Sequence, residues 1–366
     1  MNLPMTQNVV PCLGWTLVHF LWQGLAILVW LMLCLRVLRS GSANQRYLAG
    51  CAALAAMVLA PVITFSHLAR ESQIQPPLPA TDFIASAAPA GSTRSDAAPE
   101  PKIVVSFKPL PDKLSLTDRL DHNLSWLVIA WALGVFTLSG RLLIGWLQVR
   151  RLTRTAAIPL EGLWQERLAE LANRLRVSRP VRLLQSALVE VPTVIGWLRP
   201  VILLPASCLA GLTPAQLEAV LAHELAHIRR HDYFINLLQS LAETLLFYHP
   251  AVWWVSRRIR EEREHCCDDL AVRTCGDRIT YARALATLEE LRLAPPQLAL
   301  AAGGAPLLER IRRLAGRSGK EVGRSGWLVA VMLSWTAAVA LTIAFRSSRA
   351  LAEEQKESNP GAETSP

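Results

Sequence analysis

The sequence predicts an α-helical membrane protein with four transmembrane helices and a cytoplasmic α+β domain. Of its 366 residues, 52% are apolar and only 18% are charged, whereas soluble domains usually carry about a quarter charged residues. Four long runs are almost free of charge, and the segment between the third and fourth runs has the mixed composition of a folded domain. This composition excludes disordered, collagen-like and disulfide-scaffold proteins.

Each uncharged run is long enough to cross a bilayer, which takes about 20 helical residues. The first 35 residues contain no Lys, Arg, Asp or Glu, and the third run continues past Arg141, whose side chain can snorkel. The first run has no positively charged flank before it, so it does not resemble a signal peptide. The predicted spans are about 13–35, 47–69, 122–149 and 325–345.

Basic residues flank these runs and predict the topology. Clusters within 36–46, 150–154 and 310–324 all fall on one side if each run crosses once, and the positive-inside rule assigns that side to the cytoplasm. The N-terminus, the Pro-, Ala- and Ser-rich loop 70–121 and the tail 346–366 are then extracytoplasmic. Much of the net charge of +9, Arg310 included, is thereby assigned to topology and to anionic lipid headgroups, and no nucleic acid is expected as a partner.

The segment 150–324 is the part able to fold its own core, and its pattern predicts helices around a small sheet. Thr213 is a suitable N-cap, Pro214 suits the first helical position, and Gln216 can complete a capping box, so a helix should begin here. Leucines at near-helical spacing and short β-prone runs define the other elements. Helices are expected at 161–177, 214–229, 257–275 and 281–293, and strands at 181–184, 188–191 and 201–204.

The helix opened by Thr213 carries the pentad His223-Glu224-Leu225-Ala226-His227. Residues four apart share one helical face, so both imidazoles can reach one metal ion. Two histidines and a carboxylate suit Zn²⁺ and leave its fourth position open for water. Glu224 lies beside that position, where a carboxylate can take a proton from the water. The pattern therefore indicates zinc-dependent hydrolysis.

Spacing alone leaves the third ligand open. Glu264 and Asp268 are one helical turn apart, so Glu264 could bind the metal and Asp268 could orient a ligating histidine. Equally, the glutamates around 261–264 could form a solvated face paired with neighbouring arginines. The adjacent pair Cys266 and Cys267 favours buried packing over a zinc knuckle. Rival ligands are His231, His249 and His265.

With these motifs the chain resembles the BlaR/MecR-type sensor-transducer metallopeptidases, which are membrane gluzincins of bacteria. The resemblance rests on Pro192–Gly196, Pro200–Pro205, the pentad, and Arg263-Glu264 with Cys267-Asp268, together with three spans before and one after the domain. It implies a gluzincin-like zinc metallopeptidase domain with one Zn²⁺ held by His223, His227 and Glu264. It further implies Glu224 as general base and Asp268 as support for a ligand.

The resemblance also implies that the segment 192–204 supplies an edge strand for a peptide substrate, with Val194, Ile195 and Gly196 as the candidate contacts. The antibiotic-sensing members carry a large penicillin-binding domain after the fourth span. Here about 20 residues follow Phe345, so direct β-lactam sensing is not expected.

The uncharged run 233–256 contains one acidic residue, Glu243, and Pro250 should interrupt it. It could dip into the bilayer as a re-entrant hairpin, or pack as core behind the metal-binding helix. The core or juxtamembrane placement is favoured, because a fifth crossing would put Glu264 on the opposite side of the membrane from both histidines.

Three functions follow from these expectations. The first is an integral-membrane zinc endopeptidase of the bacterial inner membrane that cleaves a cytoplasmic protein, such as a transcriptional repressor, in signal transduction. The second is a membrane-protein quality-control protease, and the third is a scaffold with a relic zinc site. The lipid bilayer and a protein or peptide substrate are the expected partners, and a homodimer is left open.

Overall fold

The computed structural model describes residues 9–74, 116–155, 157–160, 162–187, 189–196, 198–293 and 304–316. The predicted fourth span, the tail and most of the loop 70–121 lie outside these residues. The chain divides into two compact units. The first comprises residues up to Phe20 and Pro61–Ala132, and the second comprises Leu21–Ala60 and the residues from Leu133 onward.

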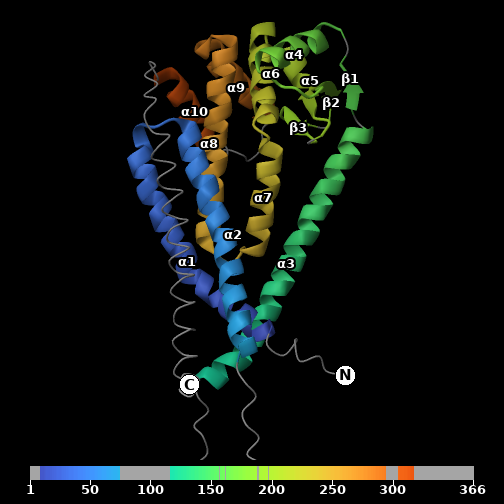
Figure 1. Ribbon diagram of the computed structural model, residues 1–366. Helices are drawn as coiled ribbons and strands as arrows, with labels where there is room; N and C mark the ends of the chain where they lie inside the picture. The colour runs from blue at the N-terminus through green and yellow to red at the C-terminus, as the bar shows by residue number, and fades with distance from the viewer. Residues whose placement is uncertain are drawn as a thin grey trace, which may run out of the picture. The chain divides into compact units, whose positions relative to one another are not determined.

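Three of the four predicted spans are confirmed as helices that are long and apolar enough to cross a membrane (Figure 1). Within them, the stretches with this property are Val9–Ser40, Ala43–Arg70 and Leu124–Gln148. The helices themselves are α1 (Val9–Val37), α2 (Ala43–Ile74) and α3 (Leu116–Thr155), and the 3-10 turn η1 (Leu38–Ser40) follows α1. In the first unit, the side chain of Leu124 packs directly on Gly14.

The second unit contains a four-stranded sheet with the order β1-β2-β4-β3. The central pair β2–β4 is parallel, and the two outer strands β1 and β3 each run antiparallel to their neighbour. All residues of β4 are buried, which fits its unbroken apolar sequence. The strands are β1 (Ala157–Pro159), β2 (Arg182–Ser186), β3 (Thr193–Ile195) and β4 (Val201–Pro205).

The strand predicted at 188–191 is wrong, because residues 189–191 are irregular and the strand begins at Thr193. Pro192 has no N–H to donate, so it ends the ladder with β4. The turn that follows β3 uses Gly196 at φ +89°, where an added Cβ would lie 3.0 Å from the carbonyl oxygen of Arg199. The sequence analysis also missed β1.

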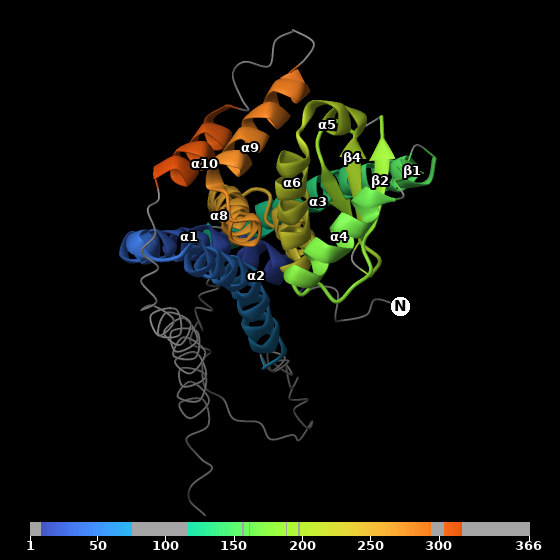
Figure 2. The same ribbon diagram turned by 90° about the horizontal axis from the view of Figure 1, so that it is seen from above.

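Helix α6 (Pro214–Arg229) has the predicted bounds and lies at the centre of the unit. Its capping box is formed: Thr213 Oγ1 accepts from the Gln216 N–H, and Gln216 Oε1 accepts from the Thr213 N–H. Figure 2 shows α6 between α4 (Leu163–Arg174) on one side and α8 (Pro250–Cys275) and α9 (Arg278–Leu293) on the other. This position explains why most of α6 from Leu217 onward is buried.

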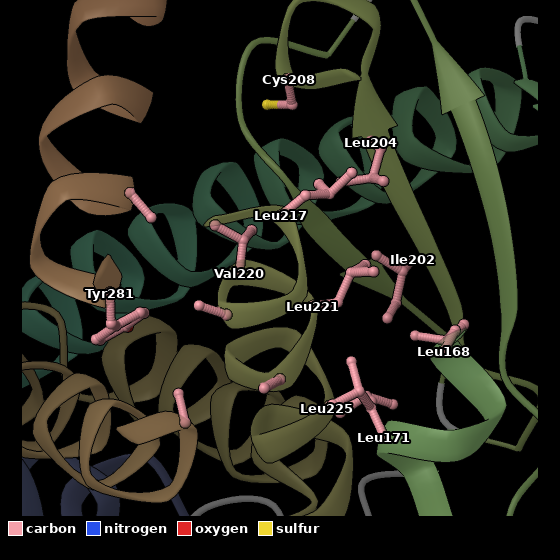
Figure 3. Packing of buried hydrophobic residues seen from close by; sticks show 14 of the residues in the cluster. Leu168, Leu171, Ile202, Leu204, Cys208, Leu217, Val220, Leu221, Leu225 and Tyr281 are labelled. Carbon is pink, nitrogen blue, oxygen red and sulfur yellow. The ribbon is translucent and has the colours of Figure 1, made fainter. Parts of the chain in front are cut away.

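Apolar side chains from α6 join the sheet and α4 in one core (Figure 3). Leu217 and Leu221 point toward Leu204 and Ile202 of β4, and Leu225 lies against Leu171 of α4. Burying each such leucine contributes about 1.5–3 kcal/mol, so this core fixes the rotation of α6 about its axis. The opposite face of α6, which carries the pentad histidines, is thereby held toward α8 and α9.

The remaining helices are α5 (Ala206–Gly211), α7 (Asp232–Leu245) and α10 (Gly304–Gly316). The break expected before Pro250 is confirmed, since α7 ends at Leu245 and Pro250 is the first residue of α8. Helix α10 was not predicted.

Candidate metal centre

Helix α6 presents the two pentad histidines on one face. The Nε2 atoms of His223 and His227 lie 3.2 Å apart, as the four-residue spacing predicts. His223 is buried and His227 is partly buried, which limits their exposure to water. The helix ends two residues after His227, and His231 in the left-handed region (φ +58°) turns the chain into α7.

Glu264 comes from α8 and completes the group. Its Oε2 lies 3.4 Å from His223 Nε2, and its Oε1 lies 3.8 Å from His227 Nε2. Ligands about 2.0–2.1 Å from a tetrahedral zinc are themselves about 3.3 Å apart. The three donor atoms all fall within 4.8 Å of one another, so two imidazoles and one carboxylate fit a zinc ion in both chemistry and spacing.

The outer nitrogen of His227 is held by a carboxylate. Asp232 Oδ2 lies 2.8 Å from His227 Nδ1, and Asp232 is the first residue of α7. Cys267 Sγ lies 3.3 Å from the same nitrogen and 3.4 Å from Asp232 Oδ2. When Nδ1–H donates to Asp232, the lone pair of His227 is on Nε2, which faces Glu264.

The outer nitrogen of His223 is held through a phenol. Tyr281 Oη, from α9, lies 2.8 Å from His223 Nδ1 and donates to Asp268 Oδ1 at 2.6 Å. Asp268 Oδ1 itself lies 3.4 Å from the same nitrogen. The imidazole N–H therefore donates to the phenol oxygen, which in turn donates to the carboxylate, and His223 Nε2 is left to accept a metal.

Arg310 of α10 contacts the carboxylates of both Asp268 and Glu264. Its Nε and Nη2 donate to the two oxygens of Asp268 at 3.0 and 2.6 Å, and its Nη1 lies 3.4 Å from Glu264 Oε2. The sequence analysis assigned Arg310 to membrane topology; in the structure its side chain is 17% exposed and contacts the centre. No pattern near 310 signalled this contact, because α10 is distant in sequence from α6 and α8.

These neighbours shift the pKa values of the metal-free centre. Burial by itself raises the pKa of Glu264, but His223, His227 and Arg310 outweigh it and hold that pKa well below its ordinary value. The pKa of Asp268 is likewise lowered, against burial, by Arg310 and His223. Burial lowers the pKa of His223, but hydrogen bonds to Asp268 and Glu264 raise it to about 9 overall.

Glu224 lines a cavity of about 450 Å³ together with both histidines and Glu264. Edge strand β3 and the residue after it also contribute to this lining, through Thr193, Val194 and Gly196. Ile195 instead packs against Leu184, Val201 and Leu203. Among the described strands β3 pairs only with β4, so its other edge is open to a peptide.

The rival histidines lie away from the three donor atoms. His249 caps α8, accepting from the Ala251 N–H through Nδ1, and His265 faces Glu262 at 3.5 Å. His231 lines the cavity but belongs to neither group of candidate ligands found in the described residues. The second such group is His227, Asp232 and Cys267. Burial raises the pKa of Cys267 well above its ordinary value in the metal-free centre, which disfavours the thiolate form that binds a metal.

Three curated proteins show similarity to segments of this chain. The chain is 30% identical over 107 residues to Regulatory protein BlaR1 of Bacillus licheniformis, which is 29% of this chain and 18% of that protein. It is 25% identical over 83 residues to Methicillin resistance mecR1 protein of Staphylococcus aureus, which is 23% of this chain and 14% of that protein. It is 51% identical over 37 residues to Protease HtpX homolog 2 of Methanosarcina acetivorans, which is 10% of this chain and 13% of that protein.

The matched segments thus span less than a fifth of each relative. The family model described as BlaR1 peptidase M56 matches residues 17–314, which include the three described spans almost entirely and the whole candidate metal centre. This family implies a metallopeptidase held in a membrane. On that match the chain belongs to the BlaR1 peptidase M56 family.

Proposed function

We propose that this protein is an integral-membrane zinc endopeptidase that hydrolyses peptide bonds of a cytoplasmic protein. The observation that carries the proposal is the convergence of His223, His227 and Glu264 beside a cavity that also contains Glu224 and the open edge of β3. One Zn²⁺ per chain would be held by these three side chains. When bound, zinc supplies a Lewis acid that polarises a carbonyl group and lowers the pKa of water.

Glu224 is the proposed general base. Glu224 lines the same cavity as both histidines, so its carboxylate can take a proton from the attacking water and deliver it to the leaving nitrogen of the cleaved peptide bond. Asp268, Tyr281 and Asp232 are positioning residues, because they act by fixing the tautomer and orientation of the two histidines.

A substrate in extended conformation can add to β3 as a further antiparallel or parallel strand. Val194 and Gly196 would then contact it inside the cavity, while the side chain of Ile195 is turned to the other face of the sheet. Backbone pairing of this kind positions a peptide with little regard to its side chains, so other lining residues would set the specificity.

The names of the relatives suggest the biological context. BlaR1 is named a regulatory protein and mecR1 a methicillin resistance protein, which favours a role in signal transduction and a transcriptional repressor as the substrate. The proposed location is the inner membrane of a bacterium, with the N-terminus outside and the peptidase domain in the cytoplasm. The short but strong similarity to an HtpX homolog favours a second candidate, a protease with many membrane-protein substrates.

Glu224→Gln tests the proposed chemistry. Cells that express the wild type, Glu224→Gln or Glu218→Gln are compared by mass spectrometry for newly formed peptide termini. Glu218 is a matched control because it lies on the same helix but outside the cavity lining. We expect cleavage products with the wild type and Glu218→Gln, and their loss with Glu224→Gln, while zinc content stays at one ion per chain in all three.

One product would favour the signalling role, and many products would favour quality control. Unchanged products in Glu224→Gln would contradict the role of Glu224. Zinc in all three proteins with no product in any of them would favour the scaffold with a relic zinc site.

A further inference from the structure

Helices α7 and α8 form a hairpin (Figure 1), and large apolar side chains are exposed on it. On α7 the exposed large side chains are Tyr233, Phe234, Leu237, Leu238 and Leu241, which repeat at helical spacing along one face. Trp253 and Trp254 are exposed at the start of α8. Leu237, Leu238 and Leu241 stay outside the buried core that α6 shares with the sheet, so the core part of the core or juxtamembrane placement does not describe this face.

The tip of the hairpin contacts two long apolar helices near the middle of their spans. His249 Nε2 donates to the carbonyl oxygen of Leu21 at 3.0 Å, and a Cβ added to Gly24 would lie 2.7 Å from the same nitrogen. Gly24 is 15 residues from one end of the span Val9–Ser40 and 16 from the other. Phe247 packs directly on Gly134, which is within the span Leu124–Gln148. The tip therefore lies at the depth of the middle of both spans.

Several polar side chains of the hairpin hydrogen-bond to one another, which a low-dielectric environment favours. Glu243 accepts hydrogen bonds from Ser256 and from Arg260 Nη1, the latter at 2.7 Å. Gln239 Nε2 donates to both oxygens of Ser256 at 2.9 and 3.0 Å. Trp253 Nε1 donates to the carbonyl oxygen of Phe247 at 2.8 Å. Glu243, the one acidic residue of the run 233–256, is therefore compatible with entry into the membrane.

The lengths of the two arms of the hairpin also fit insertion as far as the bilayer centre. Residues 250–256 carry no charge and rise about 10 Å, after which Arg257 is 74% exposed on its side chain. A tip at the bilayer centre would put Arg257 within snorkelling reach of the surface, because half of the hydrocarbon core is about 15 Å. Helix α7, with 14 residues, rises about 21 Å from the same tip, which brings Asp232 and the metal centre to the membrane surface.

We propose that α7 and residues 250–256 of α8 form a re-entrant hairpin, inserted from the side of the metal centre, whose exposed leucines face lipid acyl chains. The hairpin enters and leaves on the same side, so His223, His227 and Glu264 stay together without a fifth crossing. We assign lipid to the apolar face of the hairpin because this face is continuous with the tip, which contacts the middle of two spans.

A lipid carrying a diazirine at the end of its acyl chain tests this proposal on the unmodified full-length protein in liposomes. After photolysis, mass spectrometry should locate adducts on Leu237, Leu238, Leu241 or Trp253, and on the described spans. The exposed Ile279 of α9 is the internal control and should carry none. Adducts confined to the spans would overturn the proposal, whether protein or water covers the face.

A second measurement separates lipid from water. A nitroxide is attached through p-acetylphenylalanine at position 238 or, as control, at 279, and its collision rates with oxygen and with a water-soluble nickel chelate are compared in liposomes. At 238 we expect oxygen to be favoured by roughly tenfold or more relative to 279. A label at 238 that collides readily with nickel, or with neither reagent, would contradict contact with acyl chains.

Discussion

The two histidines of the pentad share a helix but are supported in different ways. The outer nitrogen of His227 is held by Asp232, which is five residues away in sequence. The outer nitrogen of His223 is held by Tyr281 and Asp268, and Arg310 of α10 completes that network. The support of His227 is thus mostly local, whereas the support of His223 depends on three other helices being docked.

This difference predicts that metal affinity and fold stability are coupled more strongly on the His223 side of the centre than on the His227 side. Asp268 is fully buried and its charge is compensated by Arg310, so removing either leaves an unpaired charge. The guanidinium nearest Asp232 is Arg230, at 3.7 Å, and it has other contacts with Asn44 and the ring of Tyr47. Variants of Asp268, Asp232 and Tyr281 test this difference.

Asp268→Ala should have the largest effect. It removes the bidentate partner of Arg310 and the acceptor of the Tyr281 hydroxyl. Breaking a buried ion pair from one side costs about 3–5 kcal/mol, so we expect a loss of this size in the free energy of unfolding of the metal-free protein, together with loss of zinc. Denaturant unfolding in detergent and metal analysis measure the two effects.

The double variant Asp268→Leu with Arg310→Met is the control for that experiment. Replacing both charges by apolar side chains should restore most of the stability, because no buried charge is left unpaired. It should not restore zinc affinity, since neither Glu264 nor Tyr281 regains its partner. Equal recovery of both quantities would show that Asp268 acts on the fold alone.

Asp232→Asn should separate affinity from stability. The amide keeps the shape of the side chain, but it no longer stabilises the N–H of His227 Nδ1 with a full charge. We expect zinc affinity to fall by roughly 10–100-fold and the free energy of unfolding of the metal-free protein to change by less than about 1 kcal/mol. Competition with a fluorescent chelator measures the affinity. A stability loss as large as that of Asp268→Ala would contradict the local character of this support.

Tyr281→Phe tests the phenol between His223 and Asp268. The ring is fully buried and should keep its packing, while the hydroxyl that bonds both neighbours is lost. Loss of a net contribution of about 1 kcal/mol predicts roughly fivefold weaker zinc binding by the same chelator competition. Asp268 Oδ1, at 3.4 Å from His223 Nδ1, limits the loss because it can accept the hydrogen bond of the Nδ1–H directly. Tyr233→Phe, at an exposed residue that also lines the cavity, should leave zinc affinity unchanged.

The same contrast explains what could be predicted from the sequence. Helix α6, its Thr213 cap and the break before Pro250 depend on residues close in the chain, and these predictions are confirmed. The register of β3, by contrast, is set by its pairing with β4, and the short run at 188–191 did not reveal it. Tyr281 and Arg310 reach the centre only through the packing of α9 and α10, so no local spacing marks them. Asp232 had a weak signal, because it is an acidic residue three positions after the end of the pentad helix.

Cys267→Ala should have the smallest effect and discriminates between the two candidate ligand groups. If His223, His227 and Glu264 hold the metal, the thiol is only a packing neighbour of His227 Nδ1, with weak hydrogen bonds. Because burial raises its pKa, it stays protonated, and we expect zinc affinity to change by less than about threefold. Cys275→Ala, at a partly buried thiol outside both ligand groups, is the matched control. If Cys267→Ala abolished zinc binding while Glu264→Gln kept it, the ion would belong to His227, Asp232 and Cys267, and Glu224 would no longer be adjacent to the reacting carbonyl.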